Sequence, residues 1–371
     1  MFLFGARQTG KSTLLKERFK DAIYYDLLNP NLRKAFKSNP NTLWEALQDK
    51  PAGTVVIVDE IQKVPELLDV VHSLMVDRGL FFILSGSSSR KLKRSGANTL
   101  GGRAIPETLY PLVWPEVTDF QIDRAVQNGM IPRHYMVADA TKRLSGYVKV
   151  YLDEEIREEG EVRELEAFER FMEVAAISDG EMLNYANIAS DCGVSAKTVK
   201  SYFQILYDTL IGYEIPAFRK SVKRKVVQAP RFYYFDVGLA NYLMGRHSLK
   251  RGTDDYGHAF EHLVMQEIVA YKGYNDKRDA ISYWHTYDKK RGGCCHRRRQ
   301  SCHRNQVHRK SGNQTQKRAQ SLQRGASRVP SDTRVARSCQ PQIGRHRAHL
   351  HPGFPENAVD WRNLLTPDTD L

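Results

Sequence analysis

A glycine-rich segment near the start of the chain, "GARQTGKS" (residues 5–12), has the residue types that bind phosphate. It fits the pattern of Gly, four residues and Gly-Lys-Ser. Gly5 and Gly10 allow the backbone to turn so that its N–H groups face an anion. Lys11 suits the β- and γ-phosphates of a nucleotide, and the hydroxyl of Ser12 suits Mg²⁺. We therefore expect nucleotide contacts from Gly5, Ala6, Arg7, Gln8, Thr9, Gly10, Lys11, Ser12 and Thr13.

Two adjacent carboxylates, Asp59 and Glu60, directly follow the apolar or β-branched segment 54–58. Such a segment predicts a buried parallel strand, and ligands bind at the carboxyl ends of the strands in open α/β sheets. We expect Asp59 to hold Mg²⁺ and Glu60 to orient and deprotonate the attacking water. A solvated turn would also accept two acids, but it does not explain the apolar segment before them.

Three more polar residues are candidates for the same chemistry. Ser85 and Ser87 end the apolar segment "GLFFILSGSS", and either hydroxyl could sense the γ-phosphate. Arg103, in "LGGRAIPETLYPL", could act as an arginine finger, in cis or across a subunit contact. A surface arginine is the alternative interpretation of Arg103.

The elements that position these residues can be predicted from the apolar segments. Residues 1–4, 22–27, 54–58 and 80–84 are expected to form strands of a parallel sheet. A helix that begins at Ser12 would point its positive N-terminus at the bound anion. The predicted fold class is therefore α/β, with the parallel sheet of a P-loop NTPase.

Four segments in this order resemble a prokaryotic AAA+-like ATPase family: "GARQTGKSTLL", "VVIVDEIQKVPELL", "FFILSGSSSRKL" and "LGGRAIPETLYPL". Members of that family join the ATPase to a winged helix and to a C-terminal domain of poorly defined function. The resemblance extends to about Lys290 and implies an ATPase domain over 1–117 that uses ATP and Mg²⁺. Family members usually carry a few dozen residues before the first strand, so we expect a short first strand and lower folding stability here.

The middle of the chain is expected to be helical. Residues 145–177 have apolar residues near helical spacing. The resemblance implies a helical linker over 118–170 and a winged helix over 171–246. Within the latter, "NIASDCGVSAKTVKSYFQIL" predicts a helix-turn-helix, with Gly193 in the turn and Ser195 as the N-cap of the second helix. Its predicted core is Ile188, Ala189, Val194, Val199, Phe203 and Leu206, and its predicted outward residues are Lys197, Thr198, Lys200 and Ser201.

A basic segment follows the predicted helix-turn-helix and resembles a wing hairpin. Its cations are Arg219, Lys220, Lys223, Arg224 and Lys225. With Lys197 and Lys200 they could contact the phosphates of duplex DNA. The alternative is a winged helix that packs against protein and leaves its basic wing solvated. Asp236, in "PRFYYFDVGLANYLMG", has no evident catalytic use, so we expect it to be structural.

Residues 255–290 are expected to begin a C-terminal α/β domain. An amphipathic helix is predicted in "GHAFEHLVMQEIVAYKGY", with Phe260, Leu263, Val264, Glu267 and Ile268 spaced along it, and a strand is predicted in "AISYWHT". The resemblance implies a restriction-nuclease-like fold, in which Glu261 would be the helix carboxylate. No Glu-x-Lys follows Trp284, so we expect an incomplete domain without nuclease activity.

Residues 291–371 differ in composition from the rest of the chain. They hold 16 of the 56 basic and 5 of the 43 acidic residues, a net charge of +11, whereas the first 290 residues have a net charge of +2. Only 21 of these 81 residues are hydrophobic, so a folded core is not expected there. The charge of the whole chain, +13, is therefore no argument that its body binds a polyanion.

Three interpretations of this C-terminal tail are open. Its first residues contain five potential zinc ligands: Cys294, Cys295, His296, Cys302 and His303. Their spacing fits known zinc sites poorly, and a basic nucleic-acid arm is the second interpretation. We favour a shifted reading frame, because removing one A from the codons of residues 289–291 permits "KKEVDAVIGDAKVAIEIKS", which restores a Glu-x-Lys strand. Residues 291–371 are then expected to be an out-of-frame, disordered tail.

The sequence gives no sign of export or membrane insertion, and it leaves two functions open. No apolar segment reaches about 18 residues, and the single Cys192 of the first 290 residues fits the cytoplasm. We expect an ATP-hydrolysing enzyme that uses its nucleotide state to move the winged helix and could form a homo-oligomer. The alternative is a nucleotide-switched DNA-binding regulator with little turnover.

Overall fold

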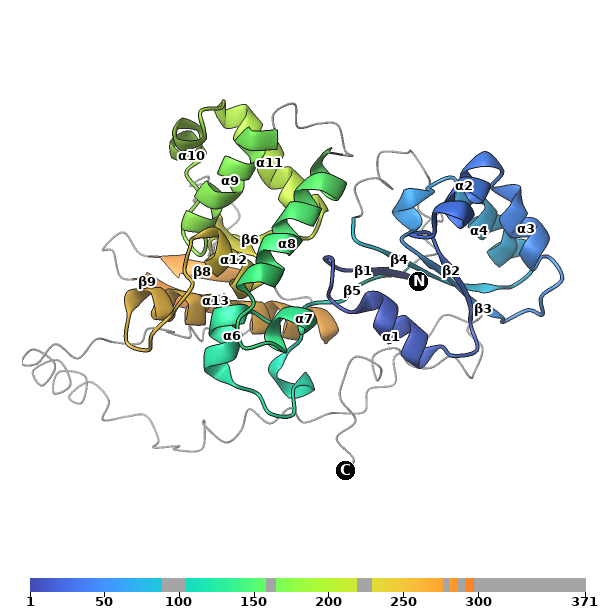
Figure 1. Cartoon of the computed structure of the whole chain (residues 1–371), viewed down its shortest axis with the longest axis horizontal. Helices are drawn as coiled ribbons and strands as arrows, with labels where there is room; N and C mark the ends of the chain where they lie inside the picture. The colour runs from blue at the N-terminus through green and yellow to red at the C-terminus, as the bar shows by residue number, and fades with distance from the viewer. Residues whose placement is uncertain (89–104, 158–164, 219–228, 276–279, 286–290, 297–371) are drawn as a thin grey trace, which may run out of the picture. The chain divides into compact units, whose positions relative to one another are not determined.

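The computed structural model describes residues 1–88, 105–157, 165–218, 229–275, 280–285 and 291–296 (Figure 1). Its elements, in chain order, are β1 (Phe2–Phe4), α1 (Lys11–Arg18), β2 (Ile23–Asp26), α2 (Pro30–Ser38), α3 (Asn41–Leu47), β3 (Val55–Asp59), the 3₁₀ helix η1 (Ile61–Lys63), α4 (Leu67–Asp77), β4 (Phe81–Gly86), β5 (Pro106–Thr108), the 3₁₀ helix η3 (Trp114–Glu116), α6 (Ile122–Asn128), α7 (Pro132–Tyr135), α8 (Thr141–Tyr151), the π-helix η4 (Leu152–Arg157), α9 (Leu165–Ile177), α10 (Tyr185–Cys192), α11 (Ala196–Asp208), β6 (Gly212–Ile215), β7 (Arg231–Tyr234), α12 (Val237–Leu243), α13 (Asp254–Tyr274), β8 (Ile281–His285) and β9 (Arg291–His296). Arg103, the five cations of the predicted wing and residues 297–371 lie outside the described residues.

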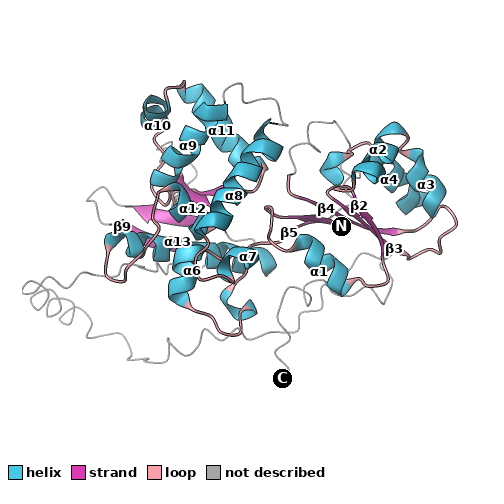
Figure 2. Cartoon of the chain, in the orientation of Figure 1, coloured by secondary structure: helices cyan, strands magenta, loops and turns pink. Residues whose placement is uncertain are grey.

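The N-terminal part contains a sheet of five described strands in the order β2-β3-β4-β1-β5. Figure 2 draws the strands in magenta. All four strand pairs are parallel, so the carboxyl ends of the strands meet at one edge. The expected strands, including the short first one, are confirmed. β4 lies between β1 and β3, and it therefore brings Ser85 between the glycine-rich loop and the two carboxylates.

Helices cover both faces of this sheet, because alternate residues of each buried strand point to opposite sides. On one face, Leu3, Ile57 and Ile83 pack with Leu15 of α1. On the other face, apolar residues of β1, β3 and β4 pack with α2, α3 and α4, which lie together across the sheet from α1 (Figure 1). The sheet is thus the middle layer of three.

Most of the segment that follows shares one hydrophobic core, to which Ala6 of the glycine-rich loop also belongs. Buried side chains of α8, the π-helix, α9, α10, α11, β7 and α12 form one cluster, in which the rings of Phe168, Phe171 and Phe203 are fully buried. Position 170, where we placed the boundary between linker and winged helix, lies inside α9. The predicted linker and the predicted module therefore share a core.

The two helices expected at 187–206 are confirmed as α10 and α11. The Thr198 N–H donates to Ser195 Oγ at 3.1 Å, so Ser195 is the N-cap of α11. Gly193 ends α10 with φ +69°, a conformation that favours glycine. The predicted core is buried apart from Val194, which is half-buried, and β6 and β7 form an antiparallel pair after α11.

Asp236 is structural, as expected. Its carboxylate is fully buried and accepts hydrogen bonds from the backbone N–H groups of Gly238 and Leu239, which makes it the N-cap of α12. It also accepts one from the Met130 N–H at 2.6 Å, beyond the end of α6. A Cβ on Gly238 would meet the carbonyl oxygen of Asn128 at 2.1 Å, so α6 and α12 approach too closely for a side chain at this point.

The C-terminal helix α13 differs from the single amphipathic stripe that we expected. Its buried residues are Ala259, His262, Leu263, Met265, Gln266 and Ala270, whereas Val264, Glu267 and Ile268 are half-buried. The reason is that α13 packs on two sides: Leu263 contacts the cluster of α6 and α12, and Met265 contacts the cluster of β6, β7 and β8. No described helix has an apolar stretch long enough to cross a bilayer.

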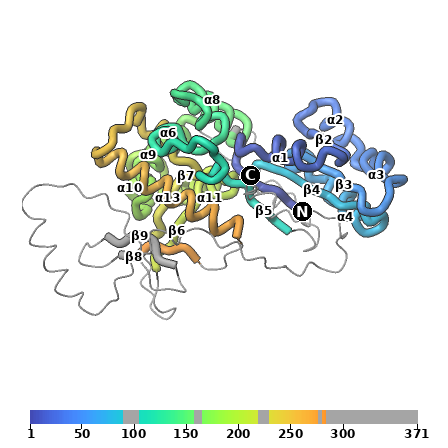
Figure 3. Tube along the Cα trace, turned by 90° about the horizontal axis from the view of Figure 1, so that it is seen from below, coloured from blue at the N-terminus to red at the C-terminus, as the bar shows by residue number. Residues whose placement is uncertain are grey.

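β8 confirms the strand expected at 280–286, and it pairs with an antiparallel strand, β9. β8 also lies near β6 (Figure 3). β9 covers residues 291–296, so the start of the expected disordered tail is ordered in these six residues. Strand pairing uses backbone N–H and C=O groups, and β9 therefore pairs an edge of β8 that would otherwise be open.

Candidate active site

The glycine-rich loop connects β1 to α1 in the strand-loop-helix arrangement that its sequence predicts. Gly10 has φ +99° and caps α1, which suits a residue without a side chain. Gly5 is needed for packing as well, because a Cβ there would meet the Leu109 carbonyl oxygen at 2.6 Å. The Lys11 ammonium lies inside the loop and donates to the carbonyl oxygens of Gly5 at 2.8 Å and Ala6 at 3.0 Å.

Lys11 and the two carboxylates share one electrostatic environment at the carboxyl edge of the sheet. Burial lowers the pKa of the Lys11 ammonium, and the charges of Glu60 and Asp59 oppose that shift. Burial also raises the pKa of the Glu60 carboxyl, while Lys11 opposes it and Asp59 adds to it. The cation and the two acids thus influence one another at the edge where β1 and β3 end.

Asp59 is held by two hydroxyl groups. It is the last residue of β3 and is 1% exposed. The Tyr24 hydroxyl donates to Oδ2 at 2.5 Å, and the Ser85 hydroxyl donates to Oδ1. Burial and the bond to Asp59 raise the pKa of Tyr24, and a hydrogen bond with Ser12 opposes this rise. Ser12, Tyr24 and Asp59 thus form a cluster of oxygen atoms, the donor type that Mg²⁺ prefers.

Glu60 has an unusual backbone conformation. Its φ of +59° lies in the left-handed region, which costs free energy for a residue with a side chain. Its carboxylate contacts the amide of Gln62 and lies 3.4 Å from Ser87 Oγ. The Gln62 amide also donates to Ser87 Oγ at 3.0 Å. Strain of this kind is concentrated at functional sites, and here it turns the acid toward the end of β4.

Arg7 of the loop is ion-paired with two glutamates from far along the chain. Its Nε donates to Glu155 Oε1 at 2.7 Å, and its terminal nitrogen lies 2.7 Å from Glu154 Oε2. Burial alone would lower the pKa of the Arg7 guanidinium. The charges and hydrogen bonds of Glu155 and Glu154 outweigh burial and raise this pKa above its ordinary value. Ser87 Oγ also donates to Glu155 Oε1, at 3.1 Å. Glu155 therefore joins the glycine-rich loop to the end of β4.

The structure brings together most of the residues that the sequence nominated, but not in equal roles. Ser85 is committed to Asp59, whereas Ser87 faces Glu60 and Glu155. Thr13 is exposed on α1. Sequence reasoning missed Tyr24, Gln62, Glu154 and Glu155. The only available signal was the position of Arg7, a cation within the loop that calls for a partner.

The residues expected to begin a nuclease site are otherwise engaged. Glu261 lies 3.4 Å from the guanidinium of Arg231, which also stacks over the ring of Tyr283. The neighbouring His262 is buried beside Asp179, with 2.8 Å between Nδ1 and Oδ2. Among the described residues no group of three or more His, Cys, Asp or Glu side chains could hold a metal. The side chains of the proposed zinc ligands lie outside this description.

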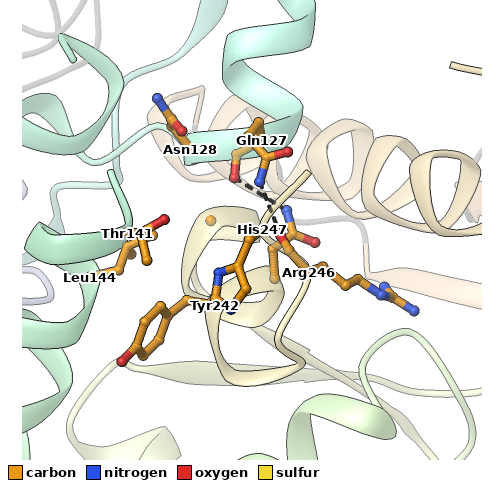
Figure 4. Close-up of a pocket in the computed structure, with 9 residues that line it drawn as sticks. Gln127, Asn128, Thr141, Leu144, Tyr242, Arg246 and His247 are labelled. Atoms are coloured by element: carbon orange, nitrogen blue, oxygen red, sulfur yellow. Dashed lines mark hydrogen bonds between the residues drawn. The ribbon is translucent and has the colours of Figure 1, made fainter. Parts of the chain in front are cut away.

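A small pocket lies away from these residues, between α6, α8 and α12 (Figure 4). Gln127 spans it and donates to the Arg246 carbonyl oxygen at 3.0 Å, and Asn128, Thr141 and His247 also line it. The side-chain oxygen of Gln127 accepts a hydrogen bond from the Leu249 N–H at 2.7 Å. The polar groups of Gln127 thus hold the loop after α12 against α6. None of the site residues predicted from the sequence lines this pocket.

Two family models match consecutive parts of the chain. Residues 1–118 match the AAA domain, and residues 119–250 match a domain of unknown function, DUF8612. The first match, with the parallel sheet and the glycine-rich loop, supports an AAA+-like P-loop ATPase domain in the N-terminal part. The second match covers the helices and the β6–β7 pair that follow.

The chain is also similar to individual proteins. It is 25% identical over 297 residues to an uncharacterized protein of Mycobacterium tuberculosis and to one of Mycobacterium bovis. Each alignment covers 77% of this chain and 65% of the length of the relative. Among solved structures, the Aeropyrum pernix ORC1 protein in complex with DNA matches 66% of this chain and 86% of its own, with 12% identity and a TM-score of 0.25.

Proposed function

We propose that the chain is a Mg²⁺-dependent, ATP-binding and ATP-hydrolysing enzyme of the AAA+-like type, coupled to a winged-helix module. One observation carries this proposal: Lys11 begins the helix that follows β1, Asp59 ends β3 and Glu60 follows it, so all three residues lie at the carboxyl edge of one parallel sheet. A phosphate-binding cation, a metal-binding acid and a second acid in one site suit phosphoryl transfer to water.

Each residue has a role that its surroundings favour. Lys11 and the N–H groups of the loop bind the phosphates, and Ser12 and Asp59 hold Mg²⁺. When bound, the metal neutralises charge on the phosphate oxygens. Glu60 takes a proton from the attacking water, and the raised pKa of its carboxyl makes it a stronger base than an ordinary glutamate. Ser87, between Glu60 and Glu155, is the better placed of the two serines to sense the γ-phosphate.

The first experiment measures ATP hydrolysis by the full chain, with Mg²⁺ and with excess EDTA. The variant Lys11→Ala removes the phosphate-binding ammonium and is expected to abolish nucleotide binding and turnover. Its matched control is Lys20→Ala, an exposed lysine just beyond α1. Equal turnover by wild type and Lys11→Ala would contradict the assignment of the site.

The second candidate function is a nucleotide-switched DNA-binding regulator with little turnover. It is favoured by α11, whose exposed face carries Lys197, Lys200 and Ser201 beside a buried core. In the DNA-binding helix-turn-helix, the second helix presents such residues to the major groove. The cations at 219–225 would add phosphate contacts to those of α11.

DNA binding by this face can be tested by salt-dependent filter retention of duplex DNA. The double variant Lys197→Gln with Lys200→Gln is expected to lower retention and to reduce its salt dependence. Lys142→Gln with Lys149→Gln, on the exposed side of α8, is the control of equal charge. A rate of hydrolysis that rises with duplex DNA favours the enzyme. DNA retention with ATP but negligible turnover favours the regulator. If no DNA is retained, the winged-helix module packs against protein instead of binding DNA.

A further inference from the structure

Glu155 is a buried acid that reaches the nucleotide site from outside the region matched by the AAA domain. It is 3% exposed, although it lies on a segment rich in charged residues. Its Oε1 accepts from Arg7 Nε at 2.7 Å and from Ser87 Oγ at 3.1 Å. A buried carboxylate is costly unless it is paired and hydrogen-bonded, and these two donors meet that requirement.

The donors that hold Glu155 are a guanidinium and a hydroxyl group, which also suit the oxygen atoms of a γ-phosphate. Arg7 belongs to the phosphate-binding loop, and Ser87 follows β4 next to Glu60. Lys11 is also within electrostatic reach of Glu155. A carboxylate and a terminal phosphate are both anions, so they repel each other and compete for the same cations and hydroxyl hydrogens.

The hydrogen-bonding capacity of the donors makes the competition direct. Ser87 has one hydroxyl hydrogen, and Glu155 and Glu60 both lie within reach of it. The Nε and one terminal nitrogen of Arg7 are committed to Glu155 and Glu154. Glu155 thus occupies the Nε–H of Arg7 and lies within reach of the one hydroxyl hydrogen of Ser87, so a new anion at this position would compete with Glu155 for both donors.

Glu155 is connected to the remainder of the molecule by the π-helix that carries it. This helix, Leu152–Arg157, follows α8 directly, and π-helical turns are frequent at functional sites. Its neighbours Leu152 and Ile156 are buried in the core that also contains α9, α10 and α11. Movement of the Glu155 side chain or of its turn is thus transmitted to packed residues beyond the ATPase domain.

We propose that Glu155 is a specificity-determining residue of the nucleotide site, because its carboxylate competes with the γ-phosphate of ATP for Arg7 and Ser87. ADP lacks that phosphate and leaves the contacts of Glu155 intact. ATP replaces Glu155 and releases the π-helix from the loop, which gives the segment after the ATPase domain a response to ATP that ADP does not cause. This inference rests on the proposed function, since it assumes that the loop binds ATP.

The test compares Glu155→Gln with wild type in binding a non-hydrolysable ATP analogue and ADP, by calorimetry on the full chain with Mg²⁺. Glutamine keeps the shape of the side chain and removes its charge. We expect the analogue to bind at least about fivefold more tightly to the variant, the lower end of usual coupling between sites, and ADP to bind as in wild type. The control is Glu166→Gln, which removes the charge of an exposed glutamate on α9, outside the nucleotide site. Both affinities of this variant should stay close to wild type.

The outcomes separate this inference from the function beneath it. A wild-type chain that binds neither nucleotide overturns the proposed function and the inference together. Normal binding by wild type, with weaker analogue binding by Glu155→Gln or with equal gains for analogue and ADP, overturns the inference alone. Hydrogen exchange of the wild-type chain is a second measurement that needs no variant: amides of residues 141–157 should exchange faster with the analogue than with ADP. Equal exchange in both states contradicts the release.

Discussion

The Tyr24 hydroxyl on β2 donates to Asp59 Oδ2 at 2.5 Å and fixes the acid at the end of β3. Groups that orient a metal-binding carboxylate typically contribute tenfold or more to metal affinity. We therefore predict that Tyr24→Phe raises the Mg²⁺ concentration for half-maximal ATP hydrolysis by about tenfold. The measurement is hydrolysis against Mg²⁺ concentration at a fixed ATP concentration.

The control for this prediction is the neighbouring Tyr25→Phe. Tyr25 is also half-buried, but it points to the opposite face of the sheet, where its ring packs edge-on against Phe36. Its hydroxyl is not the one that holds Asp59, so its loss should leave the Mg²⁺ dependence unchanged. An identical Mg²⁺ dependence in Tyr24→Phe and Tyr25→Phe would contradict the role of Tyr24.

We predict that replacing Asp236 lowers the stability of the fold strongly, although Asp236 has no catalytic role. Asp236→Ala leaves the buried N–H of Met130 without its acceptor and removes the N-cap of α12. Together these losses should lower the free energy of unfolding by about 2–4 kcal/mol. Asp139→Ala is the comparison, because Asp139 caps Thr141 with similar bonds but is exposed. Urea denaturation of both variants measures the difference, and equal midpoints would count against the buried bond to Met130.

Because Glu267 is a half-buried acid, we predict that the free energy of unfolding falls as the pH rises. Burial, together with the charge of Glu116, raises its pKa to about 7, despite the hydrogen bond from the Trp114 N–H. Between its ordinary pKa of 4.5 and about 7, the folded chain therefore holds a proton that the unfolded chain releases. The stability present below pH 4.5 is lost as the pH rises through that window.

Replacing this acid removes that loss. Glu267→Gln should unfold at a higher temperature than wild type at pH 8, by about 2–4 °C for each kcal/mol gained, with a smaller difference at pH 5. The exposed Glu166→Gln on α9 provides the charge-matched control. A difference between Glu267→Gln and wild type that is the same at both pH values would show that Glu267 does not titrate in this window.

Much of the ATPase domain could be predicted because its signals are local. The glycine pattern at 5–12 specifies a turn, and the apolar segment before Asp59 specifies a buried strand, so both follow from adjacent residues. The cap of α11 by Ser195 is local in the same way. Such features need only the preferences of a few neighbouring residues.

The contacts of Glu155 could not be predicted, because they are long-range. Arg7 and Glu155 are separated by 148 positions, and no periodicity connects them. The prediction of the buried face of α13 was also wrong in part, because a helix that packs against neighbours on two sides has no single apolar stripe. In both cases tertiary packing decides which polar or apolar residue is buried. A single sequence does not show which distant residues will pack against that residue.

The most direct test of the account is hydrolysis by Glu60→Gln. Glutamine can still pack beside Gln62 and Ser87, but it cannot accept the proton of water. We predict that this variant binds MgATP with an affinity close to wild type and that its turnover falls by a factor of about 10² or more, the usual contribution of a general base. Turnover equal to that of wild type, in a variant that still binds MgATP, would contradict the role of Glu60 as the general base.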